Sequence, residues 1–494
     1  MMKIYVKCSS IWIYPYYKGQ VPYLEKMLSV WDTVLHHYTQ KMYCFDKEEN
    51  EKYGVLKLPK GIGIETVENA INDLGIEHTV INREDSFPEI KTINVPMKKD
   101  PLNDIQYESV AFLNKNANKH QMFLTLDVGM GKTYCVTKHI SDMKKCAMII
   151  SFNLSYQWEQ RIVEDYTELK SGKDVISIVG TQYLEDVIHD RVKPNASIYI
   201  VTINTLCKLM ELYGYEELQK LANKLNIGIK VFDEAHNRYK MFNEIDLNMQ
   251  VDETIYVTAT PGRSRTEEDK MYAKMYRSIP AYGSWTSKLN NHYIIKHLTI
   301  NSYASASDRL AMKTVRGLMS SKYTKFLMDK YHDEIMKIME TYLLPILQED
   351  DNGKVLIVTD LLQNIVQIKT WFENKHPEYS IGTYCLIIDS KAEREKQLEK
   401  RIILGTVGSM QNGKDIANLR AIFPLTQFSS SIVTKQLLGR LRPLSDGRRV
   451  YYFDLADRSV PDTMRQRFSR DKVFKDKADG EIMEDYIDME HVGR

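Results

Sequence analysis

The chain has 494 residues, more than one hydrophobic core usually organises, so we expect two or three domains. Hydrophobic residues make up 43% and charged residues 27%, as in globular proteins, and no run approaches the ~18 apolar residues of a membrane span. The net charge is only +1, so a polyanionic partner would have to be held by a local patch of charge.

Residues 1–95 mix short strand-like runs with stretches of helical spacing, which predicts a small α+β accessory domain. The segment VPYLEKMLSVWDTVLHHY, residues 21–38, has apolar positions at helical spacing and is predicted as a helix. The aromatic run WIYPYY, residues 12–17, is interpreted as part of the core of this domain. Stacking of its rings on bases is the alternative interpretation.

From residue 96, short β-branched runs alternate with amphipathic helices, which is typical of a parallel sheet covered by helices on both faces. The pattern occurs twice, so we expect similar α/β units over residues 96–280 and 281–480. Residues 264–290 are charged and irregular and are interpreted as a crossing between the units. Residues 481–494 are predicted to form an acidic tail.

The stretch LTLDVGMGKTYCV, residues 124–136, joins a predicted strand to a predicted helix. Its two glycines let backbone N–H groups turn toward an anion, and the start of the helix adds the positive end of its dipole. Lys132 can reach phosphates and Thr133 can bind Mg²⁺. The loop departs from the usual phosphate-loop pattern, because Leu126 stands where the first glycine belongs. The competing interpretation is a glycine turn with an exposed lysine. The predicted phosphate cradle comprises Val128, Gly129, Met130, Gly131, Lys132 and Thr133.

A second motif, IKVFDEAHN, places Asp233 and Glu234 at the end of a buried-looking strand. An acid at that position can hold magnesium, and its neighbour can activate the attacking water. Two acids on a surface turn would be the ordinary alternative. Their position in the same unit as Lys132 favours the catalytic interpretation.

Two further motifs are weak when each is considered alone. In IYVTATPGR, hydroxyls of Thr258 and Thr260 could bond His236 and relay the state of the nucleotide to a bound polymer. In KQLLGRLRP, Gln436 and Arg440 belong to a predicted basic helix. Its arginine, Arg440, could act on a phosphate of the nucleotide. A solvated basic helix is the alternative for the second motif.

In this order, GMGKT, DEAH, TAT and QLLGR resemble the motifs of superfamily 2 helicases and nucleic-acid translocases, over roughly residues 101–477. The resemblance implies two tandem RecA-like domains in addition to the small N-terminal α+β domain. It also implies that ATP and Mg²⁺ bind in the cleft between the two RecA-like domains. It also implies roles for several other positions. Gln106 would read adenine and Asp415 would contact the nucleotide, while Gln157, Thr202, Thr406 and Lys435 would contact nucleic acid.

Within that superfamily, QLLGRLRP followed by YYFDLADRSV and RQRFSR looks most like phage-encoded helicases of the UvsW branch-migrating type. Relatives of this type often engage duplex DNA through a small N-terminal domain. The family usually has a second arginine three residues after the first, whereas Pro443 occupies that position here. Which of Arg440 and Arg442 touches the γ-phosphate is therefore open.

The resulting prediction is an ATP-dependent DNA helicase or translocase that moves along or remodels duplex, forked or branched DNA in replication, recombination or repair. We expect a cytoplasmic monomer or weak oligomer without a membrane partner; the six cysteines are scattered, with no CxxC pair. Three alternatives stay open. They are an RNA helicase, a DNA translocase without strand separation such as a restriction-system motor, and a non-motor binding protein with a vestigial nucleotide site.

Overall fold

The computed structural model describes residues 1–32, 36–39, 41–47, 51–84, 90–100, 103–126, 130–152, 156–235, 239–258, 266–283, 293–315, 317–385, 393, 396–411, 416–442, 444, 448–480 and 482–490. The chain divides into two compact units, Met1–Trp285 and Thr286–Arg494. The first unit therefore includes the N-terminal module, and its end lies close to the boundary expected at residue 280. No helix in the described part of the chain is long and apolar enough to cross a membrane.

The N-terminal module is built on a mixed five-stranded sheet in the order β5-β6-β2-β1-β7. The strands are β1 (Met2–Val6), β2 (Ser10–Tyr16), β5 (Cys44–Asp46), β6 (Gly54–Pro59) and β7 (His78–Asn82), with helices α1 (Pro22–Met27) and α2 (Ile64–Asn72). Along β2 the aromatic rings divide, because Tyr16 is fully buried whereas Tyr14 and Tyr17 are exposed.

The helix predicted over residues 21–38 is wrong beyond Met27. After α1 the chain forms a small antiparallel hairpin of β3 (Val30–Asp32) and β4 (His37–Thr39), in which Trp31 pairs with Tyr38. Val30 and Trp31 have side chains that favour strands, and cross-strand packing of the two rings offsets the loss of helix.

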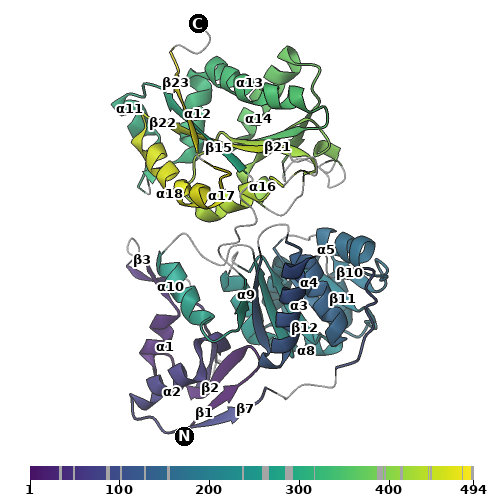
Figure 1. The fold of residues 1–494 in the computed structure, drawn as a ribbon. Helices are drawn as coiled ribbons and strands as arrows, with labels where there is room; N and C mark the ends of the chain where they lie inside the picture. Colours follow the sequence, from purple (N-terminus) through teal and green to yellow (C-terminus); the bar gives the residue numbers. More distant parts are fainter. Residues whose placement is uncertain are drawn as a thin grey trace. The chain divides into compact units, whose positions relative to one another are not determined.

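The N-terminal module shares a hydrophobic core with the rest of the first unit. Its buried side chains meet Tyr239 of α9 (Tyr239–Asn248) and Met271 and Met275 of α10 (Thr266–Met275). Figure 1 shows α10 lying beside the module. The expected crossing over residues 264–290 is thus wrong in part, because it contains a helix whose apolar side chains are buried in this core.

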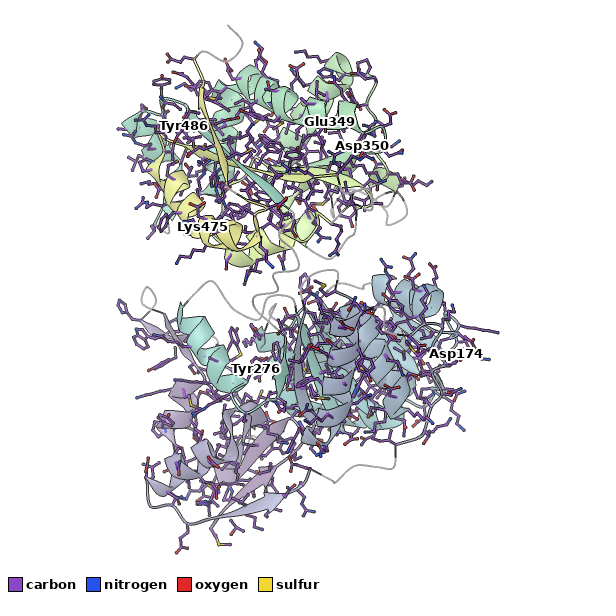
Figure 2. The ribbon with its side chains drawn as sticks, in the orientation of Figure 1. Asp174, Tyr276, Glu349, Asp350, Lys475 and Tyr486 are labelled. Atoms are coloured by element: carbon purple, nitrogen blue, oxygen red, sulfur yellow. The ribbon has the colours of Figure 1, made fainter. Side chains whose placement is uncertain are left out.

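Buried polar contacts accompany this apolar core. The Ser9 hydroxyl donates to the backbone oxygen of Asp246 at 2.9 Å, and the Lys57 ammonium donates to Asn248 Oδ1 at 2.6 Å. Tyr276, labelled in Figure 2, packs edge-on against Phe123 of the central sheet. The module is therefore a fixed part of the first unit.

The central sheet of the first unit is entirely parallel, in the order β10-β11-β9-β12-β13-β8-β14. The strands are β8 (Gln121–Thr125), β9 (Ala147–Ser151), β10 (Val175–Ile178), β11 (Ile198–Thr202), β12 (Ile229–Asp233), β13 (Glu253–Thr258) and β14 (Ala281–Tyr282). One face is covered by α3 (Asp104–Asn116), α4 (Lys132–Met143) and α5 (Tyr156–Gln160). The other face is covered by α6 (Gln182–Ile188), α7 (Ile203–Tyr213), α8 (Glu216–Lys224) and α9.

The second unit repeats this plan with a parallel sheet in the order β19-β20-β18-β21-β22-β15-β23. Its strands are β15 (Tyr293–Asn301), β18 (Lys354–Thr359), β19 (Ile381–Tyr384), β20 (Ile402–Thr406), β21 (Leu419–Pro424), β22 (Val450–Asp457) and β23 (Met483–Asp488). Helices α12 (Ser320–Lys330), α13 (His332–Glu349) and α14 (Leu362–Lys375) cover one face, while α16 (Val407–Gln411), α17 (Ser431–Leu438) and α18 (Pro461–Lys477) cover the other.

The acidic tail predicted after residue 480 is instead the edge strand β23, which pairs in parallel with β15. Ile487 packs against the core, while Tyr486 is 72% exposed at the edge of the unit (Figure 2). The acidic positions that suggested a solvated tail are partly paired, since Asp485 lies 2.8 Å from the Lys296 ammonium of β15.

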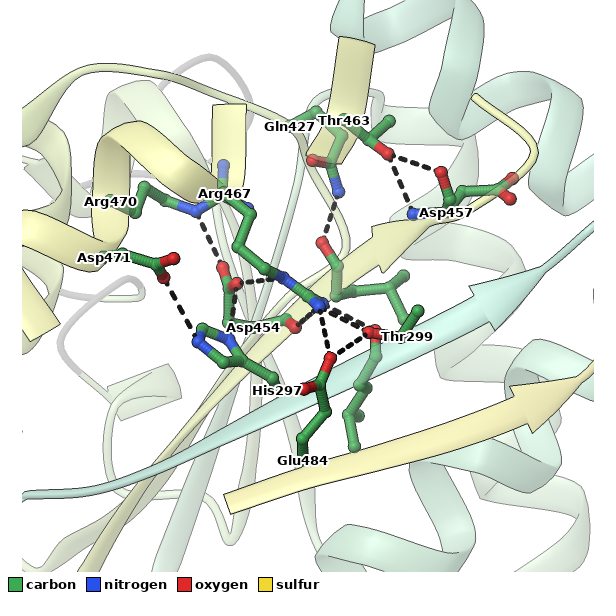
Figure 3. A network of polar contacts seen from close by, with 12 residues as sticks. His297, Thr299, Gln427, Asp454, Asp457, Thr463, Arg467, Arg470, Asp471 and Glu484 are labelled. Atoms are coloured by element: carbon green, nitrogen blue, oxygen red, sulfur yellow. Dashed lines mark hydrogen bonds and ion pairs between the residues drawn. The ribbon is translucent and has the colours of Figure 1, made fainter. Parts of the chain in front are cut away.

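Helix α18 is held on the second sheet by a buried ionic network, drawn in Figure 3. The carboxylate of Asp454 accepts from Arg467 Nε at 2.8 Å and from Arg470 Nε at 2.7 Å, and His297 Nδ1 lies 3.0 Å away. Burial by itself raises the pKa of Asp454, but the two arginine charges and the histidine outweigh it and hold this pKa below its ordinary range.

Candidate nucleotide site

The carboxyl end of the first sheet brings three of the predicted motifs together. Strand β13 lies between β8 and β12, and the register places Thr258 beside Thr125 and Val257 beside Asp233. The N–H of Leu126 donates to the Thr258 oxygen at 3.2 Å, so the loop that follows β8 starts against the end of β13. The ends of parallel strands meet at one edge, which is where α/β folds bind ligands.

The described end of the predicted phosphate loop is a left-handed glycine directly before a helix. Gly131 adopts the left-handed conformation, with φ of 87°, and immediately precedes α4, whose first residue is Lys132. The Lys132 ammonium donates to the backbone oxygen of Leu126 at 3.2 Å, so the side chain folds back over the loop. Thr133 is half-buried in the first helical turn. Val128 and Gly129 lie outside the described residues, and Met130 packs partly against the core.

Gln106, predicted to read adenine, lies directly against this loop. It is 5% exposed on α3, where its backbone N–H donates to the side chain of Asn103, the helix cap. A Cβ atom added at Gly131 would lie 2.3 Å from Gln106 Nε2, so the amide packs closely on the loop, and the positive φ of Gly131 favours glycine at this position. Sequence spacing predicted a nearby position but not this contact.

Asp233 and Glu234 end β12 beside the phosphate loop. The backbone N–H of Glu234 donates to Asp233 Oδ1 at 3.0 Å, and Glu234 has a left-handed φ of 50°. Burial, followed by the neighbouring Glu234 carboxylate, raises the pKa of Asp233 from 3.8 to about 6. The Lys132 ammonium acts in the opposite direction. A cation is therefore favoured at this position.

Trp158 is a site residue that the sequence did not assign to the nucleotide. Its indole Nε1–H donates to Asp233 Oδ2 at 2.8 Å, and the ring is 4% exposed. Only the Gln-Trp pair at residues 157–158 pointed to this segment, as a contact for nucleic acid. The hydrogen bond joins residues that are far apart in the chain, so no local pattern could reveal it.

The predicted coupling and nucleic-acid residues are only partly described. Thr258 is fully buried at the end of β13, whereas His236, Thr260 and the Gln157 side chain lie outside the described residues. The Thr202 hydroxyl at the end of β11 accepts from the Thr205 N–H at 3.1 Å and caps α7.

In the second unit, Thr406 occupies the same kind of position as Thr202, and its hydroxyl accepts from the Ser409 N–H at 3.3 Å at the start of α16. Arg440 follows α17 and is 4% exposed; its Nη2 donates to the Met410 oxygen at 2.6 Å. Arg442, Lys435 and Gln436 are half-buried, and Asp415 lies outside the described residues. The roles of these residues stay predictions.

The first-unit residues fit a magnesium–nucleotide complex. No group of three or more histidine, cysteine or acidic side chains forms a metal cage within the described ranges. Mg²⁺ bound with a nucleotide needs only one or two protein carboxylates, since phosphates and water supply the other ligands. Asp233, the glycine cradle and Lys132 match that requirement.

Residues 96–263 match the family model of the type III restriction enzyme, res subunit. This match lies within the first unit, and the two helix-covered parallel sheets agree with the tandem RecA-like fold that the order of the motifs predicted.

Among solved structures, the chain is similar to S. cerevisiae Dbp5 bound to RNA and ADP BeF3, with a TM-score of 0.53 and 13% identity over 79% of this chain and 90% of that one. T4 UvsW aligns over 99% of both chains at 13% identity, but its TM-score of 0.35 supports no conclusion. No curated protein matches the sequence. The predicted fold is confirmed; the narrower likeness to UvsW-type enzymes stays a prediction.

Proposed function

We propose that the protein is a nucleic-acid-stimulated ATPase that moves along or remodels DNA. The observation that carries this proposal is the convergence of Lys132, Asp233 and Gln106 around Gly131 at the carboxyl edge of the first sheet. An adenine reader, a phosphate-binding lysine and a cation-binding acid in one place suit ATP with magnesium.

Each residue then has a distinct role in hydrolysis. The N–H groups at the start of α4 and the Lys132 ammonium hold the phosphates, and Thr133 and Asp233 hold the magnesium. Glu234 orients and deprotonates the attacking water. Bound Mg²⁺ would neutralise phosphate charge and polarise the transferred group. An arginine of the second unit would stabilise the leaving charge; Arg442 is favoured, because it is half-buried whereas Arg440 is 4% exposed.

DNA is the proposed track. Hydroxyls at strand ends, Thr202 and Thr406, suit contacts to a phosphate backbone, so binding should be largely independent of sequence and should weaken with salt. The family match supports DNA because the named family is a restriction-enzyme subunit. An RNA track is the alternative, since the Dbp5 structure contains RNA.

The decisive experiment is an ATPase titration with single-stranded, duplex, forked and four-way DNA beside matched RNA. Stimulation by DNA, strongest with forked or four-way forms, is expected. Stimulation by RNA alone would replace DNA with RNA in the proposal, and the absence of ATP hydrolysis under every condition would reject the ATPase.

Lys132→Ala should lower kcat for ATP hydrolysis by at least 100-fold while DNA affinity changes by less than about threefold, because only the phosphate contact is lost. Lys138→Ala is the matched control, since Lys138 lies on the same helix and pairs with Asp142. Steady-state kinetics and fluorescence anisotropy give the two numbers. Unchanged hydrolysis in Lys132→Ala would show that the site is wrongly assigned.

A DNA translocase without strand separation is the second candidate, favoured by the restriction-subunit match. A forked-duplex unwinding assay separates the two. An active DNA-stimulated ATPase that displaces a triplex strand from duplex DNA but never opens the fork would be a translocase.

A further inference from the structure

The sheet of the N-terminal module has one face that the helices of the module do not cover. Helices α1 and α2 pack on the face formed by Ile4, Ile13 and Leu56, which are all fully buried. Neighbouring positions along each strand point to the opposite face. At the β6 end of that opposite face, Lys57 is 7% exposed and donates to Asn248 of α9. The part of the face over β2, β1 and β7 carries exposed and half-buried side chains.

Aromatic rings line this open part of the sheet. The register pairs Tyr5 of β1 with Trp12 of β2, and Lys3 with Tyr14, so these side chains point to the same side. Tyr14 is 41% exposed, and Tyr5 and Trp12 are half-buried. Side chains that face each other across two strands lie about 5 Å apart, and those two positions apart on one strand lie about 7 Å apart. The rings therefore form a continuous strip across two strands.

Cations lie beside the strip of rings. The ladder between β1 and β7 continues past Asn82, because the Arg83 N–H donates to the Val6 oxygen at 2.8 Å. Arg83 therefore lies beside Lys7 on the open side of the sheet. The Lys7 ammonium lies 3.1 Å from the centroid of the Trp12 ring, so this ring holds the ammonium in place on the face.

These cations are crowded and have few acids near them. Burial, followed by the charges of Lys57 and Arg83, lowers the pKa of Lys7 to about 8. Asp46 is the acid partner of Lys57. Within the described part of the chain, no acid lies within ion-pair distance of Lys7 or Arg83. A bound anion would offset the repulsion among these positive charges.

We infer that this open face binds single-stranded nucleic acid, with its tyrosine rings stacked on bases and its cations beside the phosphates. Stacking accepts any base, and the phosphate contacts make binding dependent on salt. A duplex keeps its base faces stacked against one another, so only unpaired bases can reach the rings. The face lies on a different sheet from the nucleotide site, so the inference does not depend on ATP hydrolysis. The face comprises Lys3, Tyr5, Lys7, Trp12, Tyr14 and Arg83.

The first test measures stacking by fluorescence anisotropy on the full-length protein without nucleotide. The probes are oligo(dU), oligo(rU) and a DNA duplex, each about 20 nucleotides long. Tyr14→Ala should weaken binding to the single strands about tenfold and change duplex binding less than about twofold, whereas Tyr14→Phe, which keeps the ring, should bind as wild type does. The tighter of the two single strands identifies the sugar of the ligand.

Tyr23→Ala is the matched control for stacking, since Tyr23 is 58% exposed on α1, on the other side of the module. It should leave the affinity for single strands unchanged. A folded Tyr14→Ala protein with wild-type affinity for both single strands would overturn the inference, as would an equal loss of affinity for the duplex.

The phosphate contacts are tested by neutralising the two exposed cations of the face. Lys3→Gln combined with Arg83→Gln should lower the slope of log K against log salt by about 1.4, because each contact to a single strand contributes about 0.7. Lys18→Gln combined with Lys26→Gln is the matched control, since both lysines are exposed and lie outside the face. An unchanged slope in the first variant would overturn the assignment of the phosphate contacts.

A further measurement uses the wild type and locates the strand directly. Oligonucleotides that carry 5-iodouracil crosslink on irradiation to aromatic side chains stacked on the base, and mass spectrometry identifies the crosslinked residues. Crosslinks at Tyr5 or Tyr14 are expected without nucleotide. Crosslinks confined to the chain beyond the N-terminal module would overturn the inference. A wild type that hydrolyses no ATP would instead reject the proposed function and leave this binding face in place.

Discussion

The raised pKa of Asp233 implies a cost to the stability of the ligand-free protein. This pKa is raised from 3.8 to about 6, mainly by burial, so the folded protein binds a proton more tightly than the unfolded chain. The ligand-free protein should therefore lose stability as the pH rises from about 4 through about 6, and the loss should persist above that range. Magnesium with nucleotide would remove this penalty on binding.

Asp233→Asn should consequently stabilise the ligand-free protein by about 1–2 kcal/mol at pH 8 and abolish ATP hydrolysis. Two pKa units correspond to ~2.7 kcal/mol, but the amide keeps only one acceptor for its two donors, which reduces the gain. Urea unfolding at pH 8 and pH 5 measures the effect, which should be smaller at pH 5. A destabilised variant at pH 8 would contradict the electrostatic account.

At the residue scale, the sequence could predict positions at strand ends but not contacts between distant residues. Lys132, Asp233 and Thr258 were predicted because each ends or follows a β-branched run, and parallel strands bring such ends together. The indole of Trp158 and the packing of Gln106 on Gly131 depend on which strands are neighbours and on side-chain length. Neither property can be read from a local pattern.

At the scale of elements, the carboxylate of Asp454 is shared by two arginines of helix α18. Arg467 and Arg470 are both buried and both donate to Asp454 (Figure 3). The depressed pKa of Asp454 means that this stabilisation is present above the ordinary aspartate pKa and is lost only as the pH falls through the lower folded value. The helix should therefore stay docked in mildly acidic solution.

Asp454→Asn should destabilise the second unit by about 3–5 kcal/mol, because two buried guanidinium groups lose their shared carboxylate. Urea unfolding followed by circular dichroism should show the transition of this unit at lower denaturant. Asp329→Asn, which changes an exposed acid of α12, is the control. A shift no larger than that of the control would mean that water replaces the lost carboxylate.

Strands with continuous apolar runs were predicted well. A strand that is buried on both faces does not need to alternate apolar and polar residues. The central strands β8, β9, β12 and β13 are examples. Strand β23 was missed because acids at its outer positions look like a solvated tail. The N-terminal helix was extended too far, since apolar spacing in a short segment does not distinguish a helix from a hairpin.

At the scale of the molecule, the N-terminal module is a structural part of the first unit. Met271, Tyr272 and Met275 of α10 are buried in a hydrophobic cluster to which the module contributes most of the side chains. An accessory domain on a linker would have left a polar surface there. This docking could not be predicted from the sequence, because the apolar side chains of α10 lie in a segment rich in charged residues.

Deletion of residues 1–95 should therefore yield an aggregating protein, since it uncovers a contiguous apolar patch on α9 and α10. Size-exclusion chromatography and sedimentation should show soluble aggregates or loss to the pellet. Full-length protein that carries Lys3→Ala, a substitution on an exposed position of β1, should stay monodisperse. A soluble, ATP-hydrolysing deletion protein would contradict the structural role.

Strand β23 has a consequence for how the second unit is made. Its partner β15 opens that unit, whereas β23 arrives only after every other strand of the sheet. During synthesis on the ribosome, the edge of β15 that pairs with β23 therefore stays unpaired until the intervening strands have emerged. Unpaired strand edges can pair with other chains and cause aggregation. Newly synthesised protein should accordingly depend on chaperones until β23 has paired with β15.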